Sequence, residues 1–184
     1  MLSFSIALAR AEDTDDVLAL QDQNHVSVLP IETLASGFVT TQLSPDTIAQ
    51  MRANEGVWTV RASNGDLVGY ACANDWPFYG DGPFQNSAKS LLPCDVNGRS
   101  VKVDNSFQYG PVCVAQEFRG QGVLELLVAT IKAHYVPRFE FGITFIDTRN
   151  ERSLAAHERK LGFHRLALLP AGSVIYNMLA FSTR

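Results

Sequence analysis

The chain has 184 residues, of which 46% are hydrophobic and 18% are charged, and this balance favours one globular domain over residues 1–184 with a well-filled core. Fifteen Lys and Arg residues against 19 Asp and Glu residues give a net charge of −4. That charge argues against nucleic acid as the main partner. Three cysteines, Cys72, Cys94 and Cys113, lack the paired spacing of a metal site, and their odd number argues against a disulfide framework.

Membrane and targeting segments are not expected from the sequence. The apolar stretch at residues 2–9 is short for a signal peptide, and no Lys or Arg precedes it. No run of 18 apolar residues that could span a membrane occurs in the sequence. We therefore expect a cytoplasmic protein with no membrane partner.

The first quarter of the chain is expected to form a strand and two helices. Residues 2–9 alternate larger and smaller side chains, which predicts an opening strand. Asp13 is expected to cap the first helix, with Asp16 at the capping-box position. Ser44 followed by Pro45 predicts the start of a second helix, because serine caps helix N-termini and proline is favoured in the first turn.

A β-hairpin and a variable stretch follow. The β-rich runs 57–61 and 67–72 flank Asn64-Gly65, a pair that favours a type I′ hairpin turn. The stretch 74–104 is rich in turn formers and aromatic residues, and is expected to hold a short helix and a small hairpin.

The second half alternates strands and helices, in the order strand 106–115, helix 122–135, strand 139–148, helix 151–161 and strand 174–181. The helix between the first two of these strands predicts that they run parallel. The fold class is therefore α+β (mixed α/β). We expect a central mixed, mostly antiparallel sheet with one parallel pair, flanked by helices.

The chemistry is expected to centre on the loop that joins strand 106–115 to the next helix. The β-branched residues Val112 and Val114 lead to Arg119-Gly120-Gln121-Gly122, and an apolar helix begins at once. A glycine turn at a helix N-terminus presents backbone N–H groups and the positive end of the helix dipole. With the added cation of Arg119, this pattern predicts a site for a phosphate or pyrophosphate.

The loop fits neither familiar nucleotide-binding pattern. No Lys-Ser or Lys-Thr follows the glycines, as a Walker loop requires, and Glu125 stands where a Rossmann loop has its third glycine. The loop instead resembles motif A of the GCN5-related N-acetyltransferase (GNAT) superfamily, [Q/R]xxGx[G/A] after a V-x-V strand. Arg119 and Gly122 match that pattern, and Leu124 stands where Gly or Ala is usual.

A second motif carries the same resemblance. Asn150, Ser153 and His157 look like the family's NxxSxxx[Y/H] helix, and Gly162-Phe163 looks like its terminal GF pair. The gap between His157 and Gly162 is one residue longer than is common, so we expect the helix to be rotated or bulged near its end. The resemblance covers essentially the whole chain.

The resemblance implies acetyl-CoA as cofactor and a set of residues that contact it. These residues are Val112, Cys113, Val114, Arg119, Gly120, Gln121, Gly122, Val123, Leu124, Asn150 and Ser153. It also implies that His157 donates a proton to the leaving thiolate, with Tyr176, Tyr109 and Tyr70 as rivals. The general base stays open among Asp104, Gln108 and Asp147.

Gly110-Pro111 interrupts a predicted strand and has two interpretations. It can be an ordinary bulge, because proline cannot donate to a strand ladder. Under the resemblance it marks the point where the strand parts from its parallel neighbour and admits the pantetheine arm of the cofactor.

The predicted function is an acetyl-CoA-dependent N-acetyltransferase that acts on the amine of an unidentified, small-molecule acceptor. The alternatives are a non-catalytic acyl-CoA-binding or regulatory module on the same fold, and a nucleotide-binding domain with an unfamiliar loop. The aromatic segment 76–84 is expected either to wall the acceptor pocket or to form a lid or dimer contact. A homodimer is usual for the resembling family.

Overall fold

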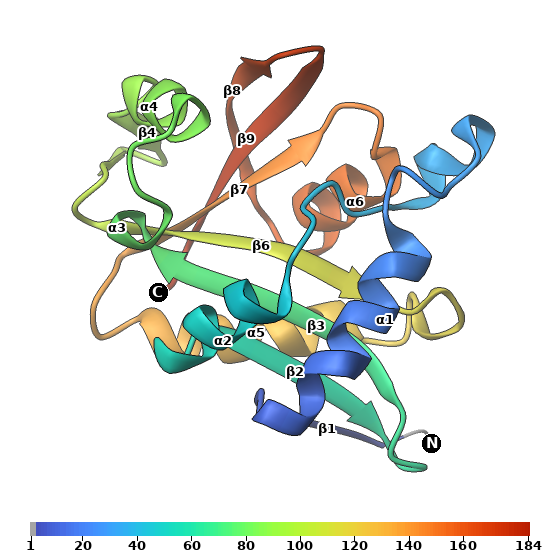
Figure 1. Ribbon diagram of the computed structural model, residues 1–184. Coiled ribbons are helices and arrows are strands. Elements are labelled where there is room, and N and C mark those ends of the chain that lie inside the picture. The colour runs from blue at the N-terminus through green and yellow to red at the C-terminus, as the bar shows by residue number, and fades with distance from the viewer. Residues whose placement is uncertain (1–2) are drawn as a thin grey trace. The chain divides into compact units, whose positions relative to one another are not determined.

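The structure is a computed structural model that describes residues 3–184 (Figure 1). The strands are β1 (Phe4–Leu8), β2 (Val57–Ala62), β3 (Leu67–Asp75), β4 (Cys94–Val96), β5 (Arg99–Val101), β6 (Ser106–Val114), β7 (Phe141–Asp147), β8 (His164–Ala171) and β9 (Val174–Ser182). The helices are α1 (Thr14–Asn24), α2 (Pro45–Ala53), α3 (Trp76–Tyr79), α4 (Pro83–Ser90), α5 (Val123–Tyr135) and α6 (Glu151–Ala155). A π-turn, η4 (Ala156–Lys160), follows α6, and short 3-10 turns are η1 (Ala11–Asp13), η2 (Ile31–Ser36) and η3 (Gln116–Phe118).

The main sheet is mixed, as expected. Its strand order is β1-β2-β3-β6-β7-β9-β8, and β4 pairs with β5 in a separate hairpin. The β6–β7 pair is parallel, whereas β1–β2, β2–β3, β7–β9 and β8–β9 are antiparallel. The α+β class and the parallel pair joined through helix α5 are therefore confirmed.

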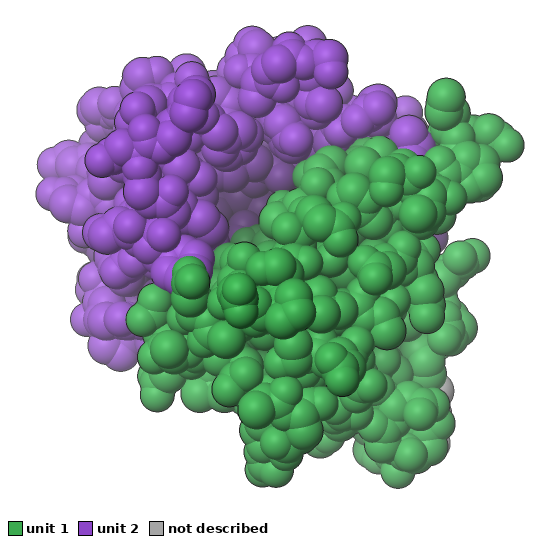
Figure 2. Space-filling model, in the orientation of Figure 1, with its two compact units in different colours: residues 1–33, 38–73, 110–131 green, residues 34–37, 74–109, 132–184 purple. Residues whose placement is uncertain are grey.

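The described residues gather into two compact units (Figure 2). The N-terminal unit comprises the described residues up to 33 together with 38–73 and 110–131, and the C-terminal unit comprises 34–37, 74–109 and 132–184. The expectation of a single domain over 1–184 stays a prediction. None of the described helices is both long and apolar enough to cross a bilayer.

In the N-terminal unit, α1 and α2 pack together beside the β1-β2-β3 strands (Figure 1). The Ser44 hydroxyl accepts a hydrogen bond from the Thr47 N–H at 3.1 Å, so the predicted cap of α2 is confirmed. Val17 and Leu20 of α1 are buried, as expected for its inner face. A helix so short depends on this packing, because its intrinsic stability in water is marginal.

Two local predictions in this unit are wrong. Asp13 makes no side-chain cap on α1; its carboxylate instead accepts from the Arg10 N–H at 2.7 Å and from Arg61. The turn at Asn64-Gly65 is not type I′, because Gly65 has a positive φ of 91° and Asn64 does not. The Gly65 N–H binds the Ala62 carbonyl at 2.9 Å, the pattern of a type I turn that ends in a glycine bulge.

In the C-terminal unit, the 74–104 stretch covers part of one face of β7 and β9. Phe141, Ile143 and Met178 from that face share a buried cluster with Trp76 and Ala88. The expected short helix is α4, and the expected hairpin is β4–β5. Both Asn97 (φ 55°) and Gly98 (φ 78°) adopt the left-handed conformation that its tight turn requires.

The end of the chain differs from the predicted element order by one strand. β8 was not predicted, and it pairs with β9 through a register shift between Arg165 and Ala167. The bulge predicted before Gly162 is confirmed as η4, where the Leu161 N–H binds the Ala156 carbonyl five residues back at 3.2 Å. A single extra residue in a helix is commonly absorbed as such a π-turn.

Candidate active site

The loop between β6 and α5 turns at two glycines with left-handed backbone. Gly120 and Gly122 adopt positive φ values of 80° and 90°, and a Cβ at either position would meet nothing within 4 Å. The first helical bond runs from the Leu126 N–H to the Gly122 carbonyl at 2.9 Å. Since the helix has no earlier carbonyls to offer, the N–H groups of Val123 and Leu124 are available for a ligand.

Arg119 is held by the N-terminal unit itself. Its Nε donates to the Val114 carbonyl at 3.0 Å, and its Nη2 donates to the Asn24 side-chain oxygen at 2.8 Å. These bonds fix the guanidinium between the end of β6 and the end of α1. Asn24 was not singled out from the sequence, because a helix-terminal asparagine gives no signal of a partner 95 residues away.

The last β6 residues before the loop, Val112, Cys113 and Val114, are apolar. Cys113 is 4% exposed, and burial raises the pKa of its thiol to about 12, so the thiol does not ionise at neutral pH. The Ala115 N–H pairs with the Val68 carbonyl of β3 at 2.9 Å. Cys113 and Cys72 are therefore core residues, as predicted.

The β6–β7 ladder is short. Over the described residues, its register pairs Ser106 with Phe141, Phe107 with Gly142 and Gln108 with Ile143. Tyr109 is the next residue along β6, followed by Gly110 with a φ of 119°. Gly110-Pro111, where an irregularity was predicted, thus begins two residues after Gln108, the last β6 residue of the ladder.

His157 lies in a closed aromatic environment within the C-terminal unit. It is 1% exposed, its ring contacts Phe163 with centroids 5.0 Å apart, and its Nδ1 lies 2.7 Å from the Ser153 carbonyl. Its Nε2 lies 3.4 Å from the Tyr109 hydroxyl. Burial lowers the pKa of His157 below its usual value, although the bond to Ser153 opposes that shift.

Asn150 caps α6, and its side-chain oxygen accepts from the Ser153 N–H at 3.2 Å. The predicted cofactor contacts of Asn150 and Ser153 stay predictions beside this capping role.

Asp147, at the end of β7, accepts two hydrogen bonds from Arg149. The Nη2–Oδ2 distance is 2.6 Å and the Nε–Oδ1 distance is 3.0 Å. Burial alone would raise the pKa of Asp147, but the bonds from Arg149 outweigh it and lower that pKa, which weakens Asp147 as a base.

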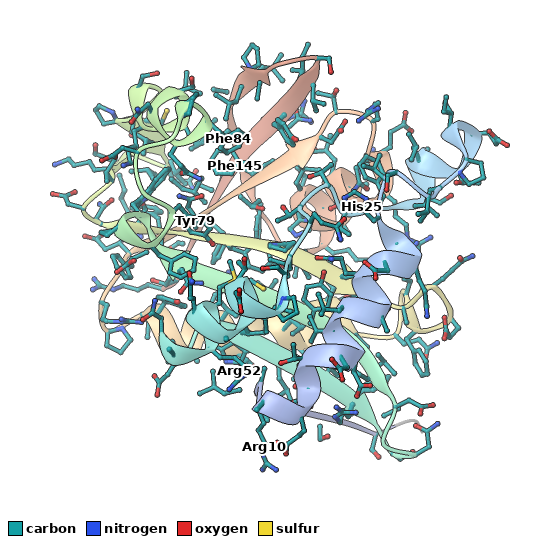
Figure 3. The ribbon with its side chains drawn as sticks, in the orientation of Figure 1. Arg10, His25, Arg52, Tyr79, Phe84 and Phe145 are labelled. Carbon is teal, nitrogen blue, oxygen red and sulfur yellow. The ribbon has the colours of Figure 1, made fainter. Side chains whose placement is uncertain are left out.

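The aromatic segment 76–84 divides between core and surface. Trp76 is 1% exposed and donates from Nε1 to the Ser106 hydroxyl at 3.0 Å. Phe84 is half-buried and meets Phe145 edge-to-face, with ring centroids 5.0 Å apart (Figure 3). The Phe84 ring also meets Tyr176 edge-to-face, with centroids 5.6 Å apart. Tyr176 therefore lies with these rings, on the strand register opposite Asp147. No local pattern indicated the Phe84–Phe145 contact, because it joins segments 61 residues apart in the chain.

Comparison with known proteins identifies a family whose model matches this chain. A model described as "Acetyltransferase (GNAT) family" matches residues 25–163, which is most of the chain. Among curated proteins, none matches significantly.

Solved structures share the fold at low sequence identity. An N-acetyltransferase from Staphylococcus aureus Mu50 has a TM-score of 0.64 at 14% identity, covering 99% of each chain. A GNAT superfamily phosphinothricin acetyltransferase from Sinorhizobium meliloti, solved in complex with AcCoA, has a TM-score of 0.64 at 17% identity, covering 97% of this chain and 88% of the other. The ribosomal-protein-S18-alanine N-acetyltransferase from Escherichia coli has a TM-score of 0.61 at 12% identity, covering 98% and 94%.

Proposed function

The chain belongs to the acetyltransferase (GNAT) family, and we propose that it transfers an acetyl group from acetyl-CoA to the amine of a small-molecule acceptor. The observation that carries the proposal is the loop of Gly120 and Gly122 at the N-terminus of α5. Its positive φ values and open surroundings let a diphosphate approach the backbone N–H groups closely. The solved relative from Sinorhizobium meliloti contains AcCoA.

Several residues of the N-terminal unit would hold the cofactor. The N–H groups of Val123 and Leu124 and the dipole of α5, a helix of 13 residues, favour the diphosphate. The loop residues Gly120 and Gln121 would line the same turn. Arg119 would supply positive charge from a side chain already oriented by Val114 and Asn24.

The strand before the loop would hold the rest of the cofactor. Val112, Cys113 and Val114 would bind the pantetheine arm through backbone groups, so their apolar side chains are free to pack in the core. A backbone N–H in this segment would also polarise the thioester carbonyl, which makes its carbon more reactive toward an amine. The thioester supplies the activated acetyl group.

The test is binding of CoA to purified protein. We expect CoA and acetyl-CoA to raise the Tm, and Arg119→Glu to abolish that rise because it places an anion against the diphosphate. Arg119→Gln separates loss of charge from repulsion and should retain part of the rise. The matched control is Arg10→Glu, since the Arg10 side chain is 76% exposed in the same unit. An unchanged shift in Arg119→Glu would contradict the assigned loop.

A non-catalytic CoA-binding module is the second candidate function. One observation favours it: the Nδ1 of His157 faces a carbonyl, so this side chain is not arranged as a free proton donor. Such a module would share the CoA-dependent rise in Tm. It would release no thiol from acetyl-CoA with any amine.

A further inference from the structure

Three aromatic rings meet at the surface of the C-terminal unit. Phe84 of α4, Phe145 of β7 and Tyr176 of β9 are each half-buried, and all three pack against the buried cluster that contains Ile143 and Met178. Figure 2 shows a hollow in the surface of this unit, and Figure 3, in the same orientation, labels Phe84 and Phe145 beside it. The rings therefore contact the core on one side and are open to solvent on the other.

The strand register places these rings on the face of the sheet where the β6–β7 ladder ends. Gln108, the last β6 residue of the ladder, pairs with Ile143, and Phe145 is the next β7 residue whose side chain lies on that face. In the β7–β9 ladder, Asp147 pairs with Tyr176. A ligand that contacts the rings would thus lie beside the end of the β6–β7 ladder.

Helix α4 is tied to β6 next to the rings. The Nε2 of Gln108 donates to the side-chain oxygen of Gln85 at 2.6 Å, and Gln85 follows Phe84 in α4. Gln108 is 5% exposed, so this hydrogen bond is largely shielded from water. The edge-to-face contacts of Phe84 with the other two rings orient its ring further. The aromatic surface is therefore ordered before a ligand binds, which lowers the entropy cost of binding.

The charges beside the rings disfavour a second cation on the ligand. Asp147 lies opposite Tyr176 in the strand register, and its side chain is 1% exposed. Arg149 occupies both oxygens of this carboxylate, and the Arg149 side chain is 50% exposed. The more accessible partner of the ion pair is therefore the cation. An ammonium group at the rings would be repelled by Arg149, while Asp147 is already neutralised.

We propose, on the premise of the acetyltransferase function above, that these three rings form the acceptor subsite and that the acceptor is a primary amine with an aromatic ring and no second cationic group. The acceptor ring packs against Phe84 and Phe145, because aromatic rings bury much apolar area and favour edge-to-face contacts. All residues of the subsite belong to the C-terminal unit. Gln108 beside it lies four residues before Val112 on β6, the strand proposed to hold the pantetheine arm.

The first experiment measures thiol release from acetyl-CoA with phenethylamine, butylamine and spermidine. All three carry a primary amine, so they differ in the ring and in the number of charges. We expect kcat/KM for phenethylamine to exceed that for either other amine about tenfold. Phe84→Leu keeps an apolar side chain and removes the ring. It should lower kcat/KM for phenethylamine about fivefold through a higher KM, and change the value for butylamine less than about twofold.

Phe139→Leu is the matched control. Phe139 is another half-buried residue of the C-terminal unit, but its ring meets those of Phe107 and Tyr135. Phe107 directly precedes Gln108 on β6, so its side chain lies on the opposite face of the sheet. Phe139→Leu should therefore keep the wild-type preference among the three amines.

The second experiment follows the binding of phenethylamine to the CoA complex by saturation-transfer NMR and needs no turnover. We expect the ring protons of phenethylamine to receive saturation from the wild-type protein. The signal should weaken in Phe84→Leu and persist in Phe139→Leu.

The outcomes separate the acceptor subsite from the proposed function. A wild-type protein that acetylates butylamine or spermidine as efficiently as phenethylamine would overturn the subsite and leave the acetyltransferase function intact. Phe84→Leu with the wild-type preference would do the same, and a changed oligomeric state in that variant would assign the rings to an interface between copies of the chain. Binding of phenethylamine without any thiol release would support the ligand class and contradict the acetyltransferase function. Neither binding nor release would overturn the subsite.

Discussion

Arg61 of β2 binds Asp13 and Asp16 with the same Nη2 atom, at 2.5 Å from Asp13 Oδ1 and 2.7 Å from Asp16 Oδ2. The two carboxylates differ in their surroundings. The side chain of Asp13 is 8% exposed, whereas that of Asp16 is 51% exposed. Asp13 also accepts from the Arg10 N–H at 2.7 Å, so its contribution to stability should be the larger one.

Asp13→Asn should therefore destabilise the protein by about 2 kcal/mol, because a buried charge-assisted network loses its anion. The matched control is Asp16→Asn, which removes the exposed partner of the same arginine and should cost less than about 0.5 kcal/mol. Urea unfolding followed by circular dichroism measures both. Equal losses in the two variants would contradict the ranking by burial.

The free energy of unfolding should decrease as the solution is acidified, because Asp13 and His157 have lowered pKa values in the folded protein. The Arg10 N–H and Arg61 lower the pKa of Asp13 despite its burial, which alone would raise it. Burial lowers the pKa of His157. A lowered folded-state pKa means that the unfolded chain binds more protons, so stability rises with pH through the window of each group.

We expect the urea midpoint to fall below about pH 6.5 as unfolded His157 becomes protonated, and again below about pH 4 as Asp13 does. His157→Asn should flatten the first decline, and Asp13→Asn should reduce the second. The midpoints can be measured from pH 8 to pH 3. A midpoint that rises as the pH falls from 7 to 5 would contradict the sign.

Gly142→Ala should destabilise the protein by about 2–3 kcal/mol. A Cβ at Gly142 would lie 2.5 Å from Cε1 of Phe181 and 2.9 Å from Cζ of Phe107, and both rings are fully buried. The matched control is Gly82→Ala, because a Cβ there would meet nothing within 4 Å. If thermal unfolding shows the two substitutions to be equally mild, the rings around Gly142 have more room than the structure describes.

Leu124→Ala should strengthen CoA binding by about 1 kcal/mol, or about fivefold in Kd. Leu124 is half-buried in the first turn of α5, where the proposed diphosphate would bind and the family usually has Gly or Ala. Calorimetric titration with CoA measures the change. Leu126→Ala, a half-buried leucine in the same helix, is the control and should leave Kd unchanged. Weaker binding by Leu124→Ala would show that the leucine assists the ligand.

The elements that the sequence predicted well are those with local causes. Ser44 caps α2, and the glycine loop precedes α5, because capping, proline and glycine preferences act within a few residues. The extra residue after His157 predicted a bulge, and η4 is that bulge. The two motifs that carry the family resemblance could be found for the same reason, since each lies in one continuous stretch.

Contacts between segments distant in the sequence decided the partner of Asp13 and the formation of β8, which local patterns could not predict. The Asp13 carboxylate binds Arg61 instead of capping its own helix, because Arg61 offers a charged partner. Arg61 lies 48 residues away in the sequence, so no local pattern could predict this contact. The strand β8 exists because β9 supplies its hydrogen bonds. Its register shift disrupts the regular alternation by which an isolated strand would be recognised.

The sequence by itself determined the family pattern, the glycine loop before α5 and the position of His157, because each follows from residues that are neighbours in the chain. Only the tertiary structure decided which nitrogen of His157 holds the proton, because that depends on a carbonyl four residues back and a hydroxyl 48 residues away. A motif places a side chain at a position in the chain. The groups that surround it in the folded protein decide which hydrogen bonds it makes.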